Sequence, residues 1–545
     1  MHLKSPEYVR KIATLVSLLL AAPAAFAASP SGWTTYGYDY ANTRHVSFSQ
    51  INPQNVKSLA PAWTFQTGIP GSFEASPIVV GKTMYLTSAN DGVFALDAAT
   101  GTLKWKYLPK LGFTSFCCGP VNRGVAVASG KVFVATLDGR LIALDARSGK
   151  PVWSAVVGDP KHGFSETLAP LAWSGMVYVG SAGGEYGIRG SVTAYAAATG
   201  KELWRWWTTS KNWEGKYRTA VHGISLHRDI AKEKADAAKY ADAWKHGGGP
   251  VWTTPSLSAR QGILYFGTGN PAPQLIGSHR PGDNLYTDSI VALNAHTGKM
   301  QWYYQETPHD VWDYDATSPT VLFKARDAKG QMVPAIGQAG KTGWFYVVNR
   351  KTGKLIRVSQ PFAPNSTIYQ KPGPNGSLIE PGALGGANWS PVSYDPATHL
   401  VFVASIVQPR FDKPLPYAEW KSGSARWAGS REQVLPTEPG SGTFTAIDVD
   451  TGRIAWQYKS PQPMIGGSLS AGGLVFVGEN NGMLDAFAAK TGKLLWQHQC
   501  GAGVNAPPIA YQIAGKEYIT VAAGGNLLLN TKPGDSVITF ALPKH

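Results

Sequence analysis

Two adjacent cysteines in the segment TSFCCGP, Cys117 and Cys118, could do chemistry, and the 545-residue chain has only one other cysteine, Cys500. As free thiols they could form a redox-active pair, or they could be buried residues that are adjacent by chance. A bond between neighbours would close a strained eight-membered ring, far from the usual disulfide geometry. Such a ring would be rigid and flat and could serve as a platform. Cys500 has no obvious partner and is expected to be a small buried residue.

Oxygen donors form the second set of residues that could do chemistry. FGTGNPAP contains Asn270, HDVWDYDA contains Asp313 and Asp315, and SAGGEYGIRG contains Glu185. Carboxylate and amide oxygens suit Ca²⁺ or another hard ion rather than zinc. Carboxylates that are buried without a partner are costly, so a purely structural role for these motifs is the weaker interpretation.

The N-terminus has the pattern of a targeting segment. Basic residues precede an apolar stretch over residues 12–22, and Ala25-Phe26-Ala27 has the small-x-small pattern of a cleavage site. We therefore expect a signal peptide at residues 1–27 and export to a bacterial periplasm, with an ordinary anchor helix as the alternative. Disulfides persist in an oxidising compartment, so export favours a bond between Cys117 and Cys118. No later stretch has 18 uninterrupted apolar residues, so no membrane span is expected.

The formal net charge of the chain is +15. Such a balance could steer an acidic partner protein. The alternative is that many of the lysines are simply solvated, because they stand in TGK turns. Nucleic acid is a poor candidate partner for an exported protein.

The elements that must position these residues follow from a repeat. Each copy is a strand, a TG turn and a second strand that ends in an aromatic residue, which is typical of a hairpin. The copies are ALDAATGTLKW (95–105), ALDARSGKPVW (143–153), AYAAATGKELW (194–204), ALNAHTGKMQW (292–302), AIDVDTGRIAW (446–456) and AFAAKTGKLLW (486–496), with a seventh, VVNRKTGKLIR (347–357), that has lost its tryptophan.

Alternating apolar runs such as KVFVATL and LVFVGEN precede most copies, so each unit is expected to have about four short antiparallel strands. Units of this length predict a propeller or a solenoid. PAWTFQTG, at residues 61–68, looks like the last strand of an eighth unit whose other strands would be YITVAAG and SVITFAL near the C-terminus. A ring closed by both ends of the chain removes two exposed sheet edges.

We therefore expect an all-β fold, a single eight-bladed β-propeller of four-stranded antiparallel blades over residues 28–545. Insertions are expected near 205–250 and 358–440, and the first contains a charged, helix-like run at 228–245. Long loops on one face of a propeller usually build the site, although simple decoration is an equal alternative.

The repeats and the cysteine pair together resemble the pyrroloquinoline quinone (PQQ) dependent alcohol dehydrogenases, whose blades carry the motif A-x-D-x-x-T-G-K-x-x-W. The resemblance covers essentially all of the chain after the signal peptide. It implies one PQQ and one metal ion. Cofactor-free scaffold propellers use similar repeats, so the function must be inferred from the site residues.

The resemblance implies where PQQ binds. The disulfide of Cys117 and Cys118 would stack on one face of the cofactor and Trp252 on the other. Arg123 would meet the cofactor carboxylates. Gly183 and Gly184 would permit close approach of the backbone. The other cofactor-binding residues implied by the resemblance are Glu74, Thr167, Lys341 and Asn388.

The resemblance also implies the metal ligands: Glu185, Asn270 and Asp313, with Asp313 as the catalytic base. Asp315 adds a fourth ligand. Calcium-dependent members usually have a small residue at that position, whereas lanthanide-dependent members have an aspartate. A lanthanide is therefore favoured, with Ca²⁺ as the alternative, because membrane glucose dehydrogenases also show Asp-x-Asp here.

Two residues depart from the family pattern. Many relatives have threonine in place of Pro250, and many alcohol dehydrogenases have a tryptophan near Ile465. The second difference predicts a mouth that is wider or differently shaped than in a methanol enzyme.

The function implied by the resemblance is oxidation of small alcohols to aldehydes, with a hydride passing to metal-bound PQQ. The chain has no C-x-x-C-H motif, so a separate periplasmic cytochrome c is the implied electron acceptor. A dehydrogenase of sugars, polyols or cyclic alcohols is the alternative if the pocket is wide. A non-catalytic scaffold would leave the site residues unexplained. The oligomeric state is open, with a homodimer as one option.

Overall fold

The computed structural model describes residues 31–113, 117–371, 373–414, 419, 421–423, 431–434 and 440–543. The predicted signal peptide at residues 1–27 lies outside these residues. Among the residues described, no helix is both long and apolar enough to cross a membrane.

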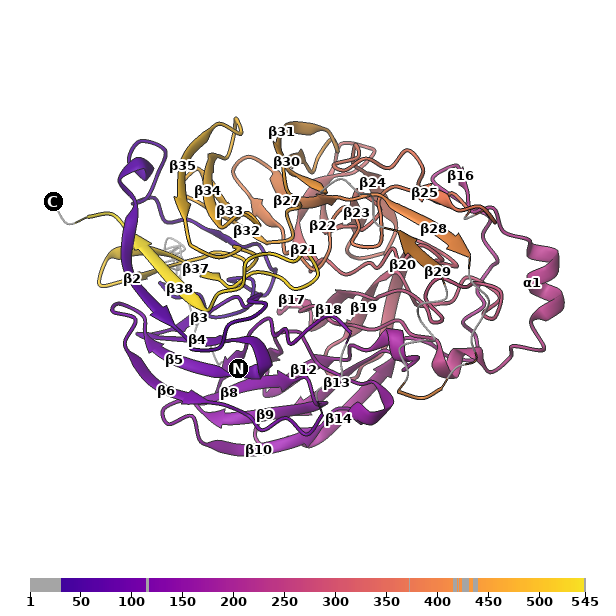
Figure 1. The fold of residues 1–545 in the computed structure, drawn as a ribbon, viewed down its shortest axis with the longest axis horizontal. Coiled ribbons are helices and arrows are strands. Elements are labelled where there is room, and N and C mark those ends of the chain that lie inside the picture. Colours follow the sequence, from indigo (N-terminus) through magenta and orange to yellow (C-terminus); the bar gives the residue numbers. More distant parts are fainter. Residues whose placement is uncertain are drawn as a thin grey trace, which may run out of the picture. The chain divides into compact units, whose positions relative to one another are not determined.

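Eight four-stranded antiparallel sheets form the blades of a propeller, as the repeats predicted (Figure 1). We number the blades in chain order. Blade 1 is β3 (Ile78–Val80), β4 (Thr83–Thr87), β5 (Val93–Asp97) and β6 (Leu103–Tyr107); blade 2 is β7 (Ala126–Ala128), β8 (Lys131–Thr136), β9 (Arg140–Asp145) and β10 (Pro151–Val156); blade 3 is β11 (Leu171–Trp173), β12 (Met176–Gly180), β13 (Ser191–Ala196) and β14 (Glu202–Trp207); blade 4 is β17 (Ser256–Ser258), β18 (Ile263–Gly267), β19 (Ser289–Asn294) and β20 (Met300–Gln305).

The second half of the ring continues the pattern. Blade 5 is β21 (Val321–Arg326), β22 (Met332–Ala339), β23 (Phe345–Asn349) and β24 (Leu355–Val358); blade 6 is β26 (Ser393–Asp395), β27 (Leu400–Val407), β30 (Ser441–Asp448) and β31 (Ile454–Ser460); blade 7 is β32 (Ser468–Ala471), β33 (Leu474–Gly478), β34 (Met483–Ala488) and β35 (Leu494–Gln499), with β1 (His45–Val46) added in parallel to β32; blade 8 is β36 (Ile509–Ile513), β37 (Lys516–Ala523), β38 (Ser536–Ala541) and β2 (Ala60–Gln66).

Both ends of the chain close the ring, as predicted. Strand β2 pairs with β38, so that Trp63 lies opposite Thr539, and β38 continues the sheet to β37 and β36. An edge strand left open at either terminus would offer unpaired backbone groups to another chain. The N-terminal strand therefore completes the last blade.

The first strand of each blade is the innermost. Strand β7 contacts both β3 and β11, and β32 contacts both β26 and β36, so these short strands face one another around the centre. The second and third strands are almost wholly buried, whereas the fourth strand alternates exposed and half-buried residues, as β6 does. Apolar side chains from neighbouring blades interdigitate between the sheets and form the core.

The repeat motif joins each blade to the next. Trp105 of blade 1 covers Gly149 in the TG turn of blade 2, where an added Cβ would lie 2.4 Å from the indole. Its Nε1–H donates to the carbonyl of Ala146 at 3.1 Å. The same pair of contacts recurs for four other tryptophans: Trp153, Trp204, Trp302 and Trp456. Glycine is required in the turn because its φ is positive and the indole leaves no room for a side chain.

The two expected insertions have different structures. The stretch near 205–250 contains the hairpin β15 (Ala220–Val221) and β16 (Ile224–Ser225), the helix α1 (Ile230–Asp236) and the 3-10 turn η5 (Ala243–His246), so the helix is shorter than the run 228–245. The stretch 358–440 is interrupted by β26 and β27, which belong to blade 6. Its parts carry a small sheet of β25 (Ser377–Ile379), β28 (Arg410–Pro414) and β29 (Arg431–Val434).

The remaining 3-10 turns are η1 (Val56–Ser58), η2 (Ala89–Asp91), η3 (Pro160–His162) and η4 (Gly184–Tyr186). Cys500 is a free, buried cysteine at the end of β35, as expected.

Candidate functional site

Antiparallel topology brings the predicted site residues to one face of the ring. In a four-stranded meander, the loop between strands two and three and the connection to the next blade lie at the same end. Glu185, Asn270 and Lys341 stand in loops of the first kind. The residues in connections of the second kind are Glu74, Cys117, Cys118, Arg123, Thr167, Trp252, Asp313, Asp315 and Asn388. The TG turns lie at the opposite end, so the docking motif and the site do not compete for space.

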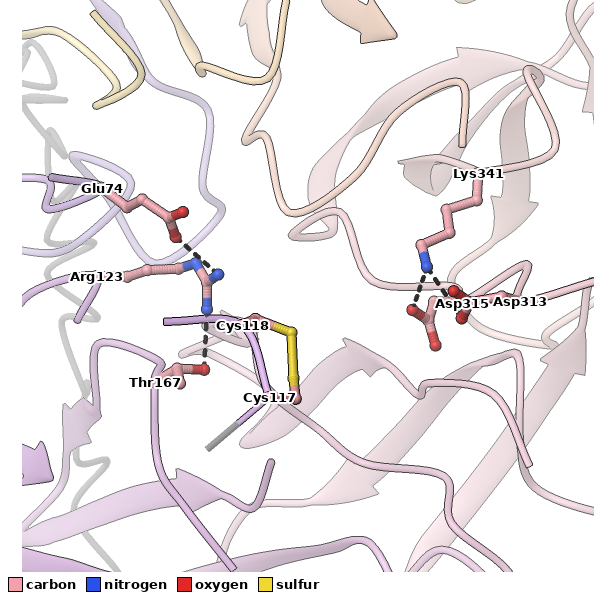
Figure 2. Close-up of a disulfide and its surroundings, with 8 residues drawn as sticks. All are labelled: Glu74, Cys117, Cys118, Arg123, Thr167, Asp313, Asp315 and Lys341. Atoms are coloured by element: carbon pink, nitrogen blue, oxygen red, sulfur yellow. Dashed lines mark hydrogen bonds and ion pairs between the residues drawn. A yellow bond between two sulfur atoms is a disulfide. The ribbon is translucent and has the colours of Figure 1, made fainter. Parts of the chain in front are cut away.

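Arg123 organises one side of the site, which we call the arginine end. Its guanidinium pairs with Glu74 at 2.8 Å and donates to the hydroxyl of Thr167 at 2.9 Å (Figure 2). The guanidinium carbon lies 5.0 Å from the ring centroids of both Trp252 and Trp389, an arrangement typical of cation–π contact. Burial raises the pKa of Glu74, and the nearby Arg123 opposes that rise.

The arginine end keeps unused hydrogen-bond donors. Among the described residues, the buried Nε of Arg123 and the buried Nε1 of Trp389 have no hydrogen-bond partner. Buried donors without partners are costly. A ligand carboxylate at this end would satisfy them, so the residues present fit the carboxylates of PQQ.

Cys117 and Cys118 form a disulfide, as expected from the sequence. Their Cα atoms are 3.8 Å apart, below the usual range for bonded cysteines, because the residues are neighbours in the chain. The two sulfurs lie within 4.8 Å of a carboxylate oxygen of Glu185. In Figure 2 the disulfide stands between Arg123 and Lys341. It thus lies beside Glu185, one of the metal-ligand candidates.

Lys341 organises the other side, the carboxylate end. Its Nζ lies 3.2 Å from Oδ1 of Asp313 and 2.6 Å from Oδ2 of Asp315 (Figure 2). Burial by itself lowers the pKa of Lys341, but the two carboxylates outweigh burial and hold that pKa above its usual value. Asp315 also accepts the backbone N–H of Asn270 at 2.6 Å, which ties two of the predicted metal-ligand loops together.

Asp313 is held in an unusual backbone conformation. Its φ is +72°, a region that non-glycine residues rarely occupy. The carboxylate of Asp310 accepts the N–H groups of Trp312 and Tyr314, both at 2.8 Å, and so fixes the turn on either side of Asp313. Burial raises the pKa of Asp313, opposed by Lys341 and reinforced by Asp315. Strain of this kind is typical of a functional position.

The carboxylate end has more negative than positive charge. Glu185, Asp313 and Asp315 contribute three carboxylates, and Lys341 is the single cation paired with them among the described residues. Oε2 of Glu185 is buried without a hydrogen-bond partner, and burial, with Asp315 adding to it, raises the pKa of this residue. A bound cation would offset both costs. The residues therefore fit a hard metal ion.

Gly183 and Gly184 stand where a side chain would clash. Gly183 has φ of +102°, and a Cβ there would lie 1.9 Å from the carbonyl oxygen of Gly163. A Cβ at Gly184 would lie 2.8 Å from the ring of Pro250. Pro250, one of the departures from the family pattern, therefore packs directly beneath the Glu185 loop.

The side-chain hydrogen bonds of Asn388 stay within its own loop. Its amide donates to the carbonyl of Leu384 and accepts the N–H of Trp389, so its side chain bonds to its own loop. Ile465 is fully buried and packs with Trp389 and Ile406, with Trp252 against the same cluster. A mouth that is wider or differently shaped near Ile465 stays a prediction.

Sequence reasoning missed two residues that the structure brings to the arginine end. Trp389 lies over Arg123, and Asn526 donates to Oε1 of Glu74 at 2.7 Å. Trp389 had a signal, because it is a tryptophan outside the repeat motif and beside Asn388. Asn526, in GGNLLLN near the C-terminus, had no such signal. It is 452 positions from Glu74 in the sequence, and only the closure of the ring brings the two residues together.

Comparison with known proteins gives consistent matches. Residues 33–367 and 355–519 match the family described as PQQ glucose/ethanol/alcohol dehydrogenase, beta-propeller domain. The chain is 34% identical to the quinoprotein alcohol dehydrogenase PedH of Pseudomonas putida, over 98% of this chain and 97% of PedH.

Solved structures agree with the sequence matches. The quinohemoprotein alcohol dehydrogenase of Comamonas testosteroni superposes with a TM-score of 0.85 at 33% identity, over 96% of this chain and 83% of that one. A europium-containing methanol dehydrogenase superposes with a TM-score of 0.83 at 30% identity, over 94% and 98%.

Proposed function

The chain belongs to the PQQ-dependent glucose/ethanol/alcohol dehydrogenase family of oxidoreductases, and from this premise we propose that it oxidises small alcohols to aldehydes in the periplasm and passes the electrons to a cytochrome c. The observation that carries the proposal is the geometry of the carboxylate end. Three carboxylates and one ammonium converge beside a disulfide, with Asp313 held in a strained turn.

We propose that PQQ is held between the two ends. Arg123 and Trp389 would bind its carboxylates, with Glu74, Asn526 and Thr167 keeping the guanidinium in place. The disulfide of Cys117 and Cys118 and the indole of Trp252 would form the flat walls. The other cofactor contacts we propose are Gly183, Gly184, Lys341 and Asn388. When bound, PQQ together with its metal ion supplies the electrophile that takes up the hydride.

Asp313 is the proposed catalytic base. Lys341 pairs with its Oδ1, which leaves Oδ2 to take the hydroxyl proton of the alcohol. The fixed turn around Asp310 holds that oxygen in place, so little reorganisation is needed when the proton moves. The disulfide carries neither proton nor hydride in this scheme; it positions the cofactor.

The proposed metal ligands are Glu185, Asn270, Asp313 and Asp315. A lanthanide is favoured over Ca²⁺ because Asp315 adds a carboxylate and a trivalent ion gains most from the additional charge. A relative described as a lanthanide-dependent methanol dehydrogenase, from Methylacidiphilum fumariolicum, is 34% identical over 91% of this chain and 85% of its own length. Its name supports the preference without deciding the metal.

Reconstitution tests the activity and the metal. The purified protein would be combined with PQQ and either Ca²⁺ or La³⁺, then assayed with ethanol, longer alcohols and a polyol, using a dye acceptor. We expect turnover of alcohols, faster with La³⁺. If no combination gives turnover, the proposal that the protein is an alcohol dehydrogenase is wrong. If the polyol is the preferred substrate, the proposal that the substrates are small alcohols is wrong. If wild type and Asp315→Ala are equally active with Ca²⁺, and neither is active with La³⁺, the preference for a lanthanide is wrong.

Two further measurements test location and acceptor. N-terminal sequencing of the exported protein should begin at Ala28. The reduction rate of an acidic periplasmic cytochrome c should fall as salt rises, because the chain carries a formal charge of +15 and salt screens the attraction between exposed opposite charges. A rate that does not change with salt contradicts electrostatic docking.

A further inference from the structure

We call residues 210–250 the strap. They lie between β14, the last strand of blade 3, and β17, the first strand of blade 4. The strap buries Trp213, Val221 and Leu226, and the last two belong to an apolar core cluster. Neither α1 nor η5 buries a residue. In Figure 1 α1 lies at the outside of the ring. Apolar burial therefore anchors the first half of the strap but not α1 or η5, and the strap also makes specific polar contacts with three loops.

The first contact is with the loop that carries Glu185. Arg189 of that loop lies between the rings of Trp207 and Trp244, with its guanidinium carbon 4.7 Å from each centroid. Trp207 belongs to β14 and Trp244 to the strap, so the arginine joins the strap to the blade. The backbone adds two hydrogen bonds, from Gly248 N to Ile188 O at 3.0 Å and from Gly190 N to Gly248 O at 2.8 Å.

The second contact is with the loop that carries Asn270. Gly249 N donates to the carbonyl of Asn270 at 2.9 Å, and Ala272 N donates to Gly247 O at 3.0 Å. Gly269 N donates to Pro250 O at 2.7 Å. A Cβ on Gly248 would lie 2.8 Å from Ala272 N, so the GGG segment is needed for this close backbone approach.

The third contact reaches the loop that carries Asp313. Arg228 of the strap is buried and pairs with Asp283 at 2.7 Å and with Glu233 of α1 at 2.6 Å. Asp283 in turn accepts the N–H of His309 at 3.1 Å through its carbonyl. His309 directly precedes Asp310, whose carboxylate fixes the turn of Asp313. Each link in this chain is a hydrogen bond or an ion pair.

We propose that the strap is a clamp that sets metal affinity without touching the metal. It contacts the Glu185 and Asn270 loops through its backbone, and it reaches the Asp313 loop through Glu233, whose carboxylate lies 3.6 Å from Nδ1 of His309. A hard ion loses affinity when its oxygen ligands must be ordered on binding, so a clamp that orders them beforehand strengthens binding. Supporting contacts of this kind typically change metal affinity 10- to 100-fold. The inference rests on the proposed metal site.

Metal titration of the full-length, metal-free protein tests the clamp. Tb³⁺ and Ca²⁺ would be titrated separately into wild type, Trp244→Ala and Arg228→Gln, with binding followed by calorimetry. We expect the Kd of the stronger-binding ion to rise about tenfold in both variants. Trp105→Ala is the matched control, because it removes a tryptophan from a blade junction far from the strap and should leave the Kd within twofold of wild type.

Hydrogen exchange gives a second readout that does not depend on metal. Amides of residues 183–190 and 270–272 should exchange faster in Trp244→Ala than in wild type, and no faster in Trp105→Ala. This measurement keeps the proposal testable if Arg228→Gln fails to fold, since that change removes the cation that pairs with the buried carboxylate of Asp283 and the half-buried carboxylate of Glu233.

The outcomes separate the clamp from the metal site. If the Kd for metal is unchanged in both strap variants, or rises equally in Trp105→Ala, the proposal that the strap sets metal affinity is wrong. A wild-type protein that binds neither ion overturns the proposed metal site and the clamp with it, and that result is seen in the wild type alone.

Discussion

The rim and the centre of the propeller are built on opposite principles. At the rim, five blade junctions repeat one contact, an indole that covers a glycine and donates to the carbonyl three residues before it. At the centre, the site combines different side chains from successive blades, and among the residues described Nε of Arg123 and Oε2 of Glu185 have no hydrogen-bond partner. Repetition spreads stability over the ring, so the centre can keep strained and unpaired groups. Changes at the rim should therefore cost stability, and changes at the centre should cost function.

Asp313→Asn should give the largest effect. It removes the proposed base but keeps the shape, so kcat for alcohol oxidation should fall about 10³-fold, equivalent to about 4 kcal/mol in the barrier. The melting temperature of the metal-free protein should not fall, because a buried charge is removed. Dye-linked kinetics and calorimetry measure the two quantities. A kcat within tenfold of wild type would contradict the role of Asp313.

Trp105→Ala should show the reverse pattern. It removes a docked indole and its hydrogen bond to Ala146, so the free energy of unfolding should fall by about 3 kcal/mol while kcat stays within twofold. Denaturant unfolding measures the loss. Leu103→Ala, on the same strand but 41% exposed, is the control and should change stability by less than about 0.5 kcal/mol. If Trp105→Ala kept its free energy of unfolding but lost its activity, the assignment of stability to the rim and function to the centre would be wrong.

Glu517 should make the seam of the ring sensitive to pH. It is buried, its Oε2 accepts the N–H of Ile51 at 3.1 Å, and burial raises its pKa from 4.5 to about 7. The folded protein therefore holds this proton more tightly than the unfolded chain does. The resulting stability is complete below pH 4.5 and is lost as the pH rises to 7.

Glu517→Gln should remove this pH dependence, a difference on the order of 3 kcal/mol between pH 4.5 and 8, since one pKa unit corresponds to about 1.4 kcal/mol. Unfolding measured at several pH values in both proteins tests it. Parallel curves for the two proteins would show that this carboxyl does not set the pH response.

Arg357→Trp should have the smallest effect, and in the favourable direction. Arg357 stands where the seventh repeat lacks its tryptophan, and its Cδ lies 3.6 Å from the position of a Cβ on Gly452. A tryptophan could cover that glycine and donate to the carbonyl of Val449, as Trp456 does to Ala489. We expect a gain of about 0.5–1 kcal/mol in unfolding free energy with unchanged kcat. A lower free energy of unfolding would mean that the contacts of Arg357 stabilise the fold more than the indole does.

The sequence predicted most of the rim because the repeat is local. The TG turn, the alternating apolar strands and the tryptophan lie within about eleven residues, and period and turn chemistry determine their structure. The stretch 358–440 was harder to divide, because a long insertion separates β27 from its blade partner β30. The helix-like run 228–245 contains only a short α1, since its residues bury too little apolar surface to extend it.

The sequence by itself determined the eight blades, their closure by the two ends of the chain, and the residue types available for a quinone and a hard metal. Only the tertiary structure decided which of these residues meet: Lys341 with Asp313 and Asp315, Asn526 with Glu74, and the strap with three distant loops. The physical reason is range. Propensity and periodicity act between neighbours in the chain, whereas charge pairing and desolvation depend on distances that exist only after the ring has closed.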